Sequence, residues 1–165
     1  MQRPEAINPI ESAPLDCRVI LRETAQHGMV QMRGRAAGGD SDQGDLAWLS
    51  KSNVTWNTPS RDSMGSMPLG NGDIGLNLWV EEGGDLLFYI SKTDAFDGNH
   101  VNRKLGRLRI TLKPNPFTVG LPFNQTLDLQ DASISIRAGK PGEEVSLKVW
   151  VDANHPVIRV CSRSD

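Results

Sequence analysis

The sequence lacks any apolar run of the ~18 residues that a transmembrane helix needs, and its start lacks the basic and then apolar segments of a signal peptide. An excess of one charge sign is also absent, because 18 Lys and Arg residues stand against 20 Asp and Glu residues. A near-neutral chain has no strong electrostatic attraction to nucleic acid or to an anionic membrane. We therefore predict that neither is a partner, and the residues alone leave the localisation unknown.

Cysteine is scarce, and it follows no metal-binding spacing. Cys17 and Cys161 lie far apart and belong to no CxxC or Cys/His pattern. A single disulfide between them is compatible with the sequence, but nothing in the spacing supports it. The sequence predicts free thiols and no metal site.

Apolar periodicity is weak in the first part of the chain. Residues 15–32 show only a faint helical pattern, and residues 33–45 have the composition of a flexible linker. The total of 165 residues suits one domain with its own core. We predict an irregular or weakly helical, poorly ordered extension over residues 1–47, and one β-sandwich domain, incomplete in length, over residues 48–165.

From residue 48 onward, apolar residues alternate with polar ones, which is the pattern of half-buried strands. Turn signals separate these runs at roughly the 8–12-residue spacing of sandwiches and barrels, and Gly83 and Gly84 suit a hairpin turn. The predicted strands are residues 53–56, 74–80, 86–91, 107–113, 127–129, 132–138, 144–151 and 157–161. The predicted fold class is all-β, an antiparallel β-sandwich.

The glycine-rich residues 70–75 match the GxGxxG pattern of dinucleotide-binding sites. That site needs a buried strand before the glycines and a helix after them, whereas Pro68 precedes them here and an alternating strand follows. No Lys-Ser/Thr pair of a Walker loop follows Gly70, and no serine lies in a nucleophile elbow. We therefore predict no cofactor and no nucleophilic triad.

Two sets of side chains have the chemistry that carbohydrate processing uses. Glycoside hydrolysis needs two carboxylates across a sugar, while tryptophan faces and amides suit sugar rings and hydroxyls. Loop acids are more often plain surface residues, and tryptophans in a sandwich are more often core. The acids are Asp62, Asp73, Asp94 and Asp97, with His100 nearby, and the second set is Trp48, Trp56, Asn57, Asn71 and Trp79.

Four short strings, taken together, resemble a known family. They are NVTWN at residues 53–57, SMGSMPLGNGDIG at 63–75, ISKTDA at 90–95 and LGR at 105–107. At this spacing, residues 51–165 resemble the N-terminal domain of large proteins similar to glycoside hydrolase family 95, and in particular the group called domain of unknown function 5703. The residues before them show no such resemblance.

The resemblance implies part of a galactose-mutarotase-like β-supersandwich, which in the family is followed by an (α/α)6 barrel that holds the catalytic residues. Related enzymes cleave α-L-fucosides or α-L-galactosides with inversion and without a cofactor, and such proteins are exported. Since the barrel is missing here, the resemblance implies a truncated reading frame and transfers no catalytic residue. It places Trp56, Asn57, Asn71 and Asp94 at the rim of a sugar pocket, where sandwich and barrel meet.

These observations lead to one functional expectation and two alternatives. The expectation is a noncatalytic β-sandwich that supports carbohydrate processing by the missing barrel domain, and without that domain the exposed sheet should self-associate. The alternatives are a stand-alone carbohydrate-binding module and a structural fragment without a ligand. Exposure of Trp56 and Trp79 on one contiguous face favours the binding module, and their burial favours the scaffold.

Overall fold

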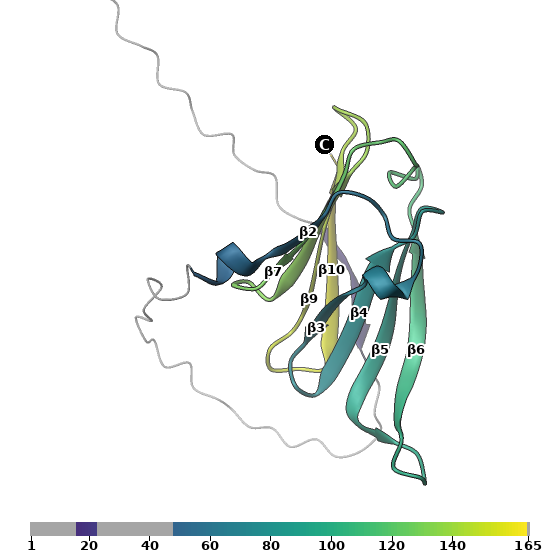
Figure 1. Ribbon diagram of the computed structural model, residues 1–165, viewed down its shortest axis with the longest axis vertical. Helices are drawn as coiled ribbons and strands as arrows, with labels where there is room; N and C mark the ends of the chain where they lie inside the picture. The colour runs from purple at the N-terminus through teal and green to yellow at the C-terminus, as the bar shows by residue number, and fades with distance from the viewer. Residues whose placement is uncertain (1–15, 23–47, 165) are drawn as a thin grey trace, which may run out of the picture.

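The computed structural model describes residues 16–22 and 48–164, which form two antiparallel sheets (Figure 1). The larger sheet contains, in spatial order, β1 (Asp16–Arg22), β10 (Val157–Ser164), β9 (Val145–Val151), β8 (Ser133–Ala138), β7 (Phe123–Asp128) and β2 (Val54–Trp56). The smaller sheet contains β3 (Met67–Gly70), β4 (Ile74–Val80), β5 (Asp85–Phe96) and β6 (Asn102–Thr111). Two short 3-10 helices, η1 (Leu49–Ser52) and η2 (Ser63–Gly65), precede β2 and β3. The predicted all-β sandwich is confirmed.

Four segments differ clearly from the strands expected from the sequence, and one of them is β7, which begins four residues before the expected 127–129. Residues 67–70 form edge strand β3, in which Pro68 lies opposite Asn77, because a proline is tolerated at the margin of a sheet. β5 and β6 extend through most of the polar residues 92–104, where backbone pairing rather than apolar alternation holds the hairpin. Residues 16–22 pair with β10 instead of following their faint helical pattern. The rest of the predicted N-terminal extension lies outside the described residues.

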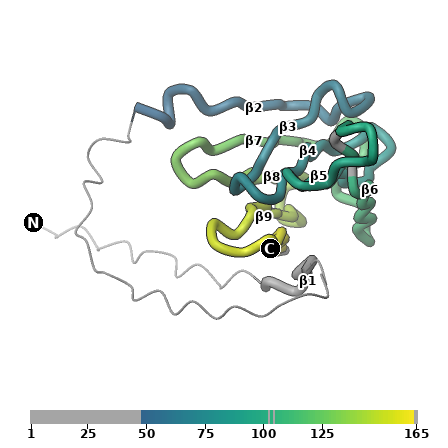
Figure 2. The backbone as a smooth tube through the Cα atoms, turned by 90° about the horizontal axis from the view of Figure 1, so that it is seen from below, coloured from purple at the N-terminus to yellow at the C-terminus, as the bar shows by residue number. Residues whose placement is uncertain are grey.

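The core lies between the two sheets and comes from the apolar rows seen in the sequence. β4 contributes Ile74, Leu76, Leu78 and Val80, all buried, and the larger sheet contributes buried residues such as Ile134, Ile136, Leu147 and Val149. Figure 2 shows the smaller sheet beside the larger one, with β3 near β8 and β6 at the outer margin. Burial of these rows is the main favourable term that holds the sheets together.

A second, thinner apolar layer lies on the outer face of the smaller sheet. Trp79 and Leu87 are buried there, outside the main core cluster. The ring of Trp79 lies 5.2 Å from that of Tyr89, centroid to centroid, and η2 contacts β4. Because Leu87 is fully buried, the outer face of β5 is covered as well as its core face.

The prediction of free thiols, which was based on cysteine spacing, is wrong for Cys161. Cys161 is fully buried and disulfide-bonded. The only other cysteine of the chain, Cys17, lies in β1, and β1 pairs with β10, the strand of Cys161. Spacing along the chain could not reveal this, because the proximity arises from the pairing of β1 with β10, two strands that are adjacent in the sheet but far apart in the sequence. Within residues 16–22 and 48–164, no helix has the length and apolarity that a membrane crossing requires.

Candidate functional site

The four residues expected at a sugar-pocket rim lie at opposite ends of β3. Asn71 follows the last residue of β3, and a chain of contacts through Asp73 and Lys92 links its turn to Asp94. Trp56 instead lies near the start of β3, where its Nε1 donates a hydrogen bond to the Gly65 carbonyl at 3.2 Å, and Asn57 follows it. The structure therefore forms two separate clusters.

Asn71 ties the two sheets together. Its Oδ1 accepts hydrogen bonds from the backbone N–H groups of Asp73 at 3.0 Å and Ile74 at 2.9 Å. Its Nδ2 donates to the backbone carbonyls of Asp152 at 2.8 Å and His155 at 3.1 Å. One amide thus connects the β3–β4 turn of the smaller sheet to the β9–β10 turn of the larger sheet. Gly72, with φ of +91°, makes the tight β3–β4 turn possible.

Lys92 joins two of the candidate acids. Its Nζ lies 3.0 Å from Asp73 Oδ1 and 2.7 Å from Asp94 Oδ1. The hydrogen bond from Lys92 lowers the pKa of Asp94, and hydrogen bonds to Asp94 and then Asp73 raise the pKa of Lys92. Asp94 is therefore held as a carboxylate, the wrong protonation state for the general acid of a glycosidase.

The other candidate acids organise turns. Asp62 accepts a hydrogen bond from the Met64 N–H at 2.8 Å and caps η2. Asp97 accepts from the N–H groups of Asn99 and Val101, both at 2.9 Å, and from Arg103, so it shapes the tip of the β5–β6 hairpin. His100 lies exposed at that tip with φ of +58°. Asp62 and Asp97 therefore have local structural roles.

Asp152 is a polar centre that sequence reasoning missed. Its Oδ1 lies 3.0 Å from His155 Nδ1, and its Oδ2 accepts hydrogen bonds from Arg159 Nε at 3.3 Å and Nη2 at 3.0 Å. The N–H of Asn154 also donates to Oδ1 at 3.1 Å. An acid two residues before Asn154, at the start of the Asn-His-Pro turn, was the available signal, because aspartate commonly accepts N–H groups two residues on.

The pH dependence of stability should reveal Asp152. Hydrogen bonding from His155, then from Asn154 and Arg159, lowers the pKa of Asp152 from 3.8 to about 2. The folded chain holds the carboxylate more strongly than the unfolded chain does, so this group stabilises the fold above pH 3.8 and loses its contribution as the pH falls to about 2. We expect the urea midpoint, followed by circular dichroism, to fall across this window, and to fall less steeply in Asp152→Asn.

The comparison of the two proteins removes the contributions of other acids. The pKa values of Asp85, Asp94 and Asp97 are also lowered, and these groups are unchanged in the variant. Equal pH slopes for the wild-type chain and Asp152→Asn would show that Asp152 is not coupled to folding.

The second cluster, around Trp56, is apolar and open. Val54 and Trp56 share one face of β2 by alternation and are 37% and 41% exposed, while Met64, beside the Gly65 that Trp56 contacts, is 91% exposed. We call Val54, Trp56 and Met64 the Trp56 surface. Thr55, on the opposite face of β2, bonds Thr126 at 3.1 Å. Val54 and Trp56 thus lie on one side of the sheet edge.

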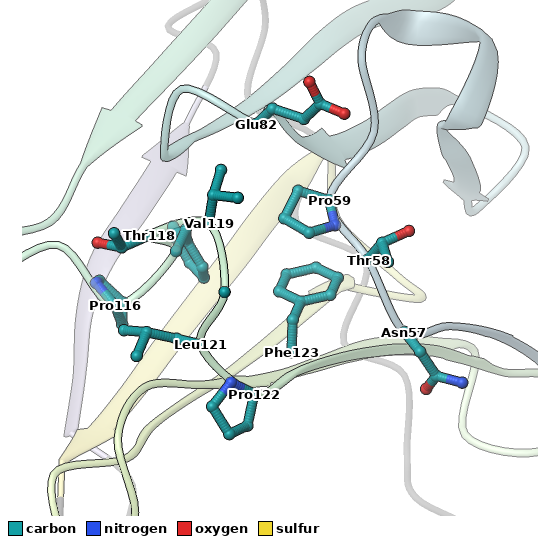
Figure 3. Close-up of a pocket in the computed structure, with 12 residues that line it drawn as sticks. Asn57, Thr58, Pro59, Glu82, Pro116, Thr118, Val119, Leu121, Pro122 and Phe123 are labelled. Atoms are coloured by element: carbon teal, nitrogen blue, oxygen red, sulfur yellow. The ribbon is translucent and has the colours of Figure 1, made fainter.

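A pocket of about 550 Å³ opens next to this surface (Figure 3). Residues 57–59 after β2, the β4–β5 turn and the loop before β7 converge on it. Its lining is mainly apolar, with the rings of Pro59 and Phe123 near each other and Glu82 above them. Asn57 lines the pocket while its Oδ1 accepts a hydrogen bond from Asn124 at 3.1 Å. The lining residues are Asn57, Thr58, Pro59, Glu82, Pro116, Phe117, Thr118, Val119, Gly120, Leu121, Pro122 and Phe123.

The tryptophans do not form one exposed face. Trp79 is only 2% exposed and lies in the outer layer of the smaller sheet, whereas Trp56 lies on β2 of the larger sheet. The expectation from the sequence required both tryptophans to be exposed for a binding module and both to be buried for a scaffold, and with Trp79 buried and Trp56 exposed neither condition is met. In the described parts of the chain, no group of three or more His, Cys, Asp or Glu side chains could hold a metal ion.

Comparison with known proteins gives one family. Searches of curated proteins and of solved structures find no match to this sequence or fold. A family model does match residues 55–165, which include every described strand from β3 to β10. Because the match covers well over half of the sequence, the chain belongs to the family described as domain of unknown function (DUF5703), through its N-terminal model.

Proposed function

We propose that this chain is the noncatalytic β-sandwich of a glycoside hydrolase-like protein, and that it supports carbohydrate processing by docking against a barrel domain. The observation that carries the proposal is the Trp56 surface with the pocket beside it. Exposed apolar side chains gathered at one site are characteristic of protein interfaces, whereas singly scattered ones are not. The docking part of the proposal rests on this surface, and the glycoside hydrolase part rests on the family strings in the sequence.

The geometry suits a partner that is itself a folded domain. Met64 and Val119 are 91% and 74% exposed, so both can lose much apolar area to water-excluding contacts. Val119 also lines the pocket, which has the volume to take apolar side chains from a facing surface. Covering the Trp56 surface and the pocket together would bury a continuous region formed by β2, η2 and the loop before β7.

The polar cluster at the other end of β3 supports a scaffold role. Both the Oδ1 and the Nδ2 of Asn71 are engaged in holding the two sheets, and the carboxylate of Asp94 is paired with the ammonium group of Lys92. Polar groups that are engaged in this way make the fold rigid, and they are not free to act as a catalytic acid and base. A rigid sandwich is what a docked catalytic domain needs from its neighbour.

The proposal is tested by expressing the chain together with the coding sequence that follows it in the gene. We expect a helical barrel to be encoded there and the extended protein to hydrolyse an aryl α-L-fucoside or α-L-galactoside. The double variant Met64→Asp/Val119→Asp should lower kcat/KM at least about tenfold, because two carboxylates in an apolar contact lose their hydration. Activity on the chromogenic glycoside and limited proteolysis between the domains are the two measurements.

Val101→Asp is the matched control, since Val101 is an equally apolar, 55% exposed side chain at the distant β5–β6 tip. A downstream sequence without a barrel, or an extended protein whose activity ignores the double variant, would contradict the proposal. Trp56-dependent binding of a sugar by the isolated chain would instead identify a carbohydrate-binding module. If the extended protein has no glycosidase activity, and the isolated chain binds no sugar and stays monomeric in sedimentation, the chain would be a structural sandwich without a ligand.

A further inference from the structure

β6 is an open edge of the smaller sheet. It is the last strand in the order β3-β4-β5-β6, and within the described residues no strand pairs with its outer side (Figures 1 and 2). An edge strand carries a row of backbone N–H and C=O groups without ladder partners. A Cβ placed on Gly106, in the middle of β6, would meet nothing within 4 Å, so the space around that position is open.

The same edge is strongly basic. Residues 102–113 hold Arg103, Lys104, Arg107, Arg109 and Lys113, and no acidic residue. Arg107 and Lys113 are exposed and form no ion pair among the described residues. Arg103 pairs with Asp97 and Arg109 with Asp85, yet their side chains remain 66% and 50% exposed. Unpaired positive charge therefore lies at Arg107 within β6 and at Lys113 just after it, and the paired guanidinium groups of Arg103 and Arg109 stay partly open to solvent.

An apolar side chain lies in the middle of this basic row. Leu105 is 48% exposed. The pairing register shifts between Ile90 and Ser91, which lie opposite Gly106 and Lys104, so Leu105 has no residue opposite it in the ladder. Such a bulge leaves Leu105 available for contact with an added strand.

We propose that β6 accepts an extended acidic segment of a partner protein as an additional strand of the smaller sheet. The open backbone would supply ladder hydrogen bonds, and the basic side chains would pair with Asp or Glu on alternate residues of the incoming segment. Leu105 would contact an apolar side chain between them.

The charges select among occupants. Basic side chains on an edge strand ordinarily prevent pairing with a second copy, because arginine would face arginine. The same charges attract an acidic strand, so β6 disfavours a second copy of itself and favours an acidic segment. An anionic polysaccharide shares the charge but has no backbone ladder to offer β6. The open ladder therefore favours a peptide.

The test uses a fluorescein-labelled peptide of alternating glutamate and valine, with the full chain, in fluorescence anisotropy. We expect saturable binding, loss of binding when alternate peptide nitrogens are methylated, and weaker binding as salt increases. Arg107→Glu/Lys113→Glu should raise the Kd at least about tenfold, because the new carboxylates would repel the glutamates of the peptide. In ¹⁵N–¹H NMR spectra of the wild-type chain, shift changes should concentrate on β6 and β5.

Arg137→Glu is the matched control, because Arg137 is an exposed arginine on β8 of the other sheet and should leave the Kd unchanged. Failure of the acidic peptide to bind would overturn the proposal. Binding that survives N-methylation would reduce it to charge attraction without a ladder. Heparin that binds as tightly and shifts the same β6 resonances would assign the edge to an anionic polysaccharide instead.

Discussion

Trp79→Ala is expected to lower the free energy of unfolding by about 3–5 kcal/mol, the cost of emptying a large buried aromatic site. Trp79 is 2% exposed and packs on Tyr89 at 5.2 Å between ring centroids, so alanine would leave a cavity in the outer layer. Urea unfolding followed by circular dichroism measures the change without relying on tryptophan fluorescence.

Two further variants make this result specific. Trp48→Ala removes the same side chain from a site that is 59% exposed and should change the unfolding free energy by no more than about 0.5 kcal/mol. Trp79→Phe should cost less than Trp79→Ala, because it keeps most of the apolar volume and removes a buried Nε1 that has no hydrogen-bond partner among the described residues. Equal stabilities for Trp79→Ala and Trp48→Ala would contradict the packed outer layer.

The second large effect is expected for Asn71→Ala, at about 2–4 kcal/mol. Asn71 makes four hydrogen bonds, two as acceptor within its own turn and two as donor to the β9–β10 turn. Each such bond contributes about 0.5–1.5 kcal/mol net, and all four are lost together. The same urea titration gives the value, and amide hydrogen exchange should show faster opening at both turns.

Asn77→Ala is the appropriate control, because Asn77 is an exposed asparagine on the adjacent strand β4. Its loss should be nearly neutral. Asn71→Asp separates the two halves of the interaction, since aspartate keeps the acceptors for Asp73 and Ile74 but faces the two carbonyls without a donor. If Asn71→Asp were as stable as the wild-type chain, the tie between the sheets would contribute nothing, and the scaffold role assigned to Asn71 would be wrong.

Much of the sandwich could be predicted because its strands are half buried. Residues 74–80 and 144–151 alternate so regularly that they match β4 and β9 within one residue at each end. The strand prediction was less accurate where pairing with a distant segment, rather than apolar alternation, holds the chain in a strand. β3 contains a proline and lies at a sheet edge, and the outer half of the β5–β6 hairpin is mostly polar.

The candidate site was predicted less completely, for a related reason. The strings of residues 67–75 and 90–95 do lie together, because Asp73 and Asp94 share Lys92. Trp56 and Asn57 lie instead at the other end of β3, which no spacing in the sequence could show. Asp152 entered the first cluster from a turn far along the chain, through Asn71.

The sequence by itself determined that this chain is a β-sandwich, and its family strings identified the group to which it belongs, because alternation and glycine turns are local properties of neighbouring residues. Tertiary structure alone decided the rest. It buried Trp79 but left Trp56 open, bonded Cys161 in a disulfide, and used Asn71 to join the sheets. Each of these outcomes depends on which distant segments pair or pack together, and that information is carried by the whole fold rather than by any one stretch of residues.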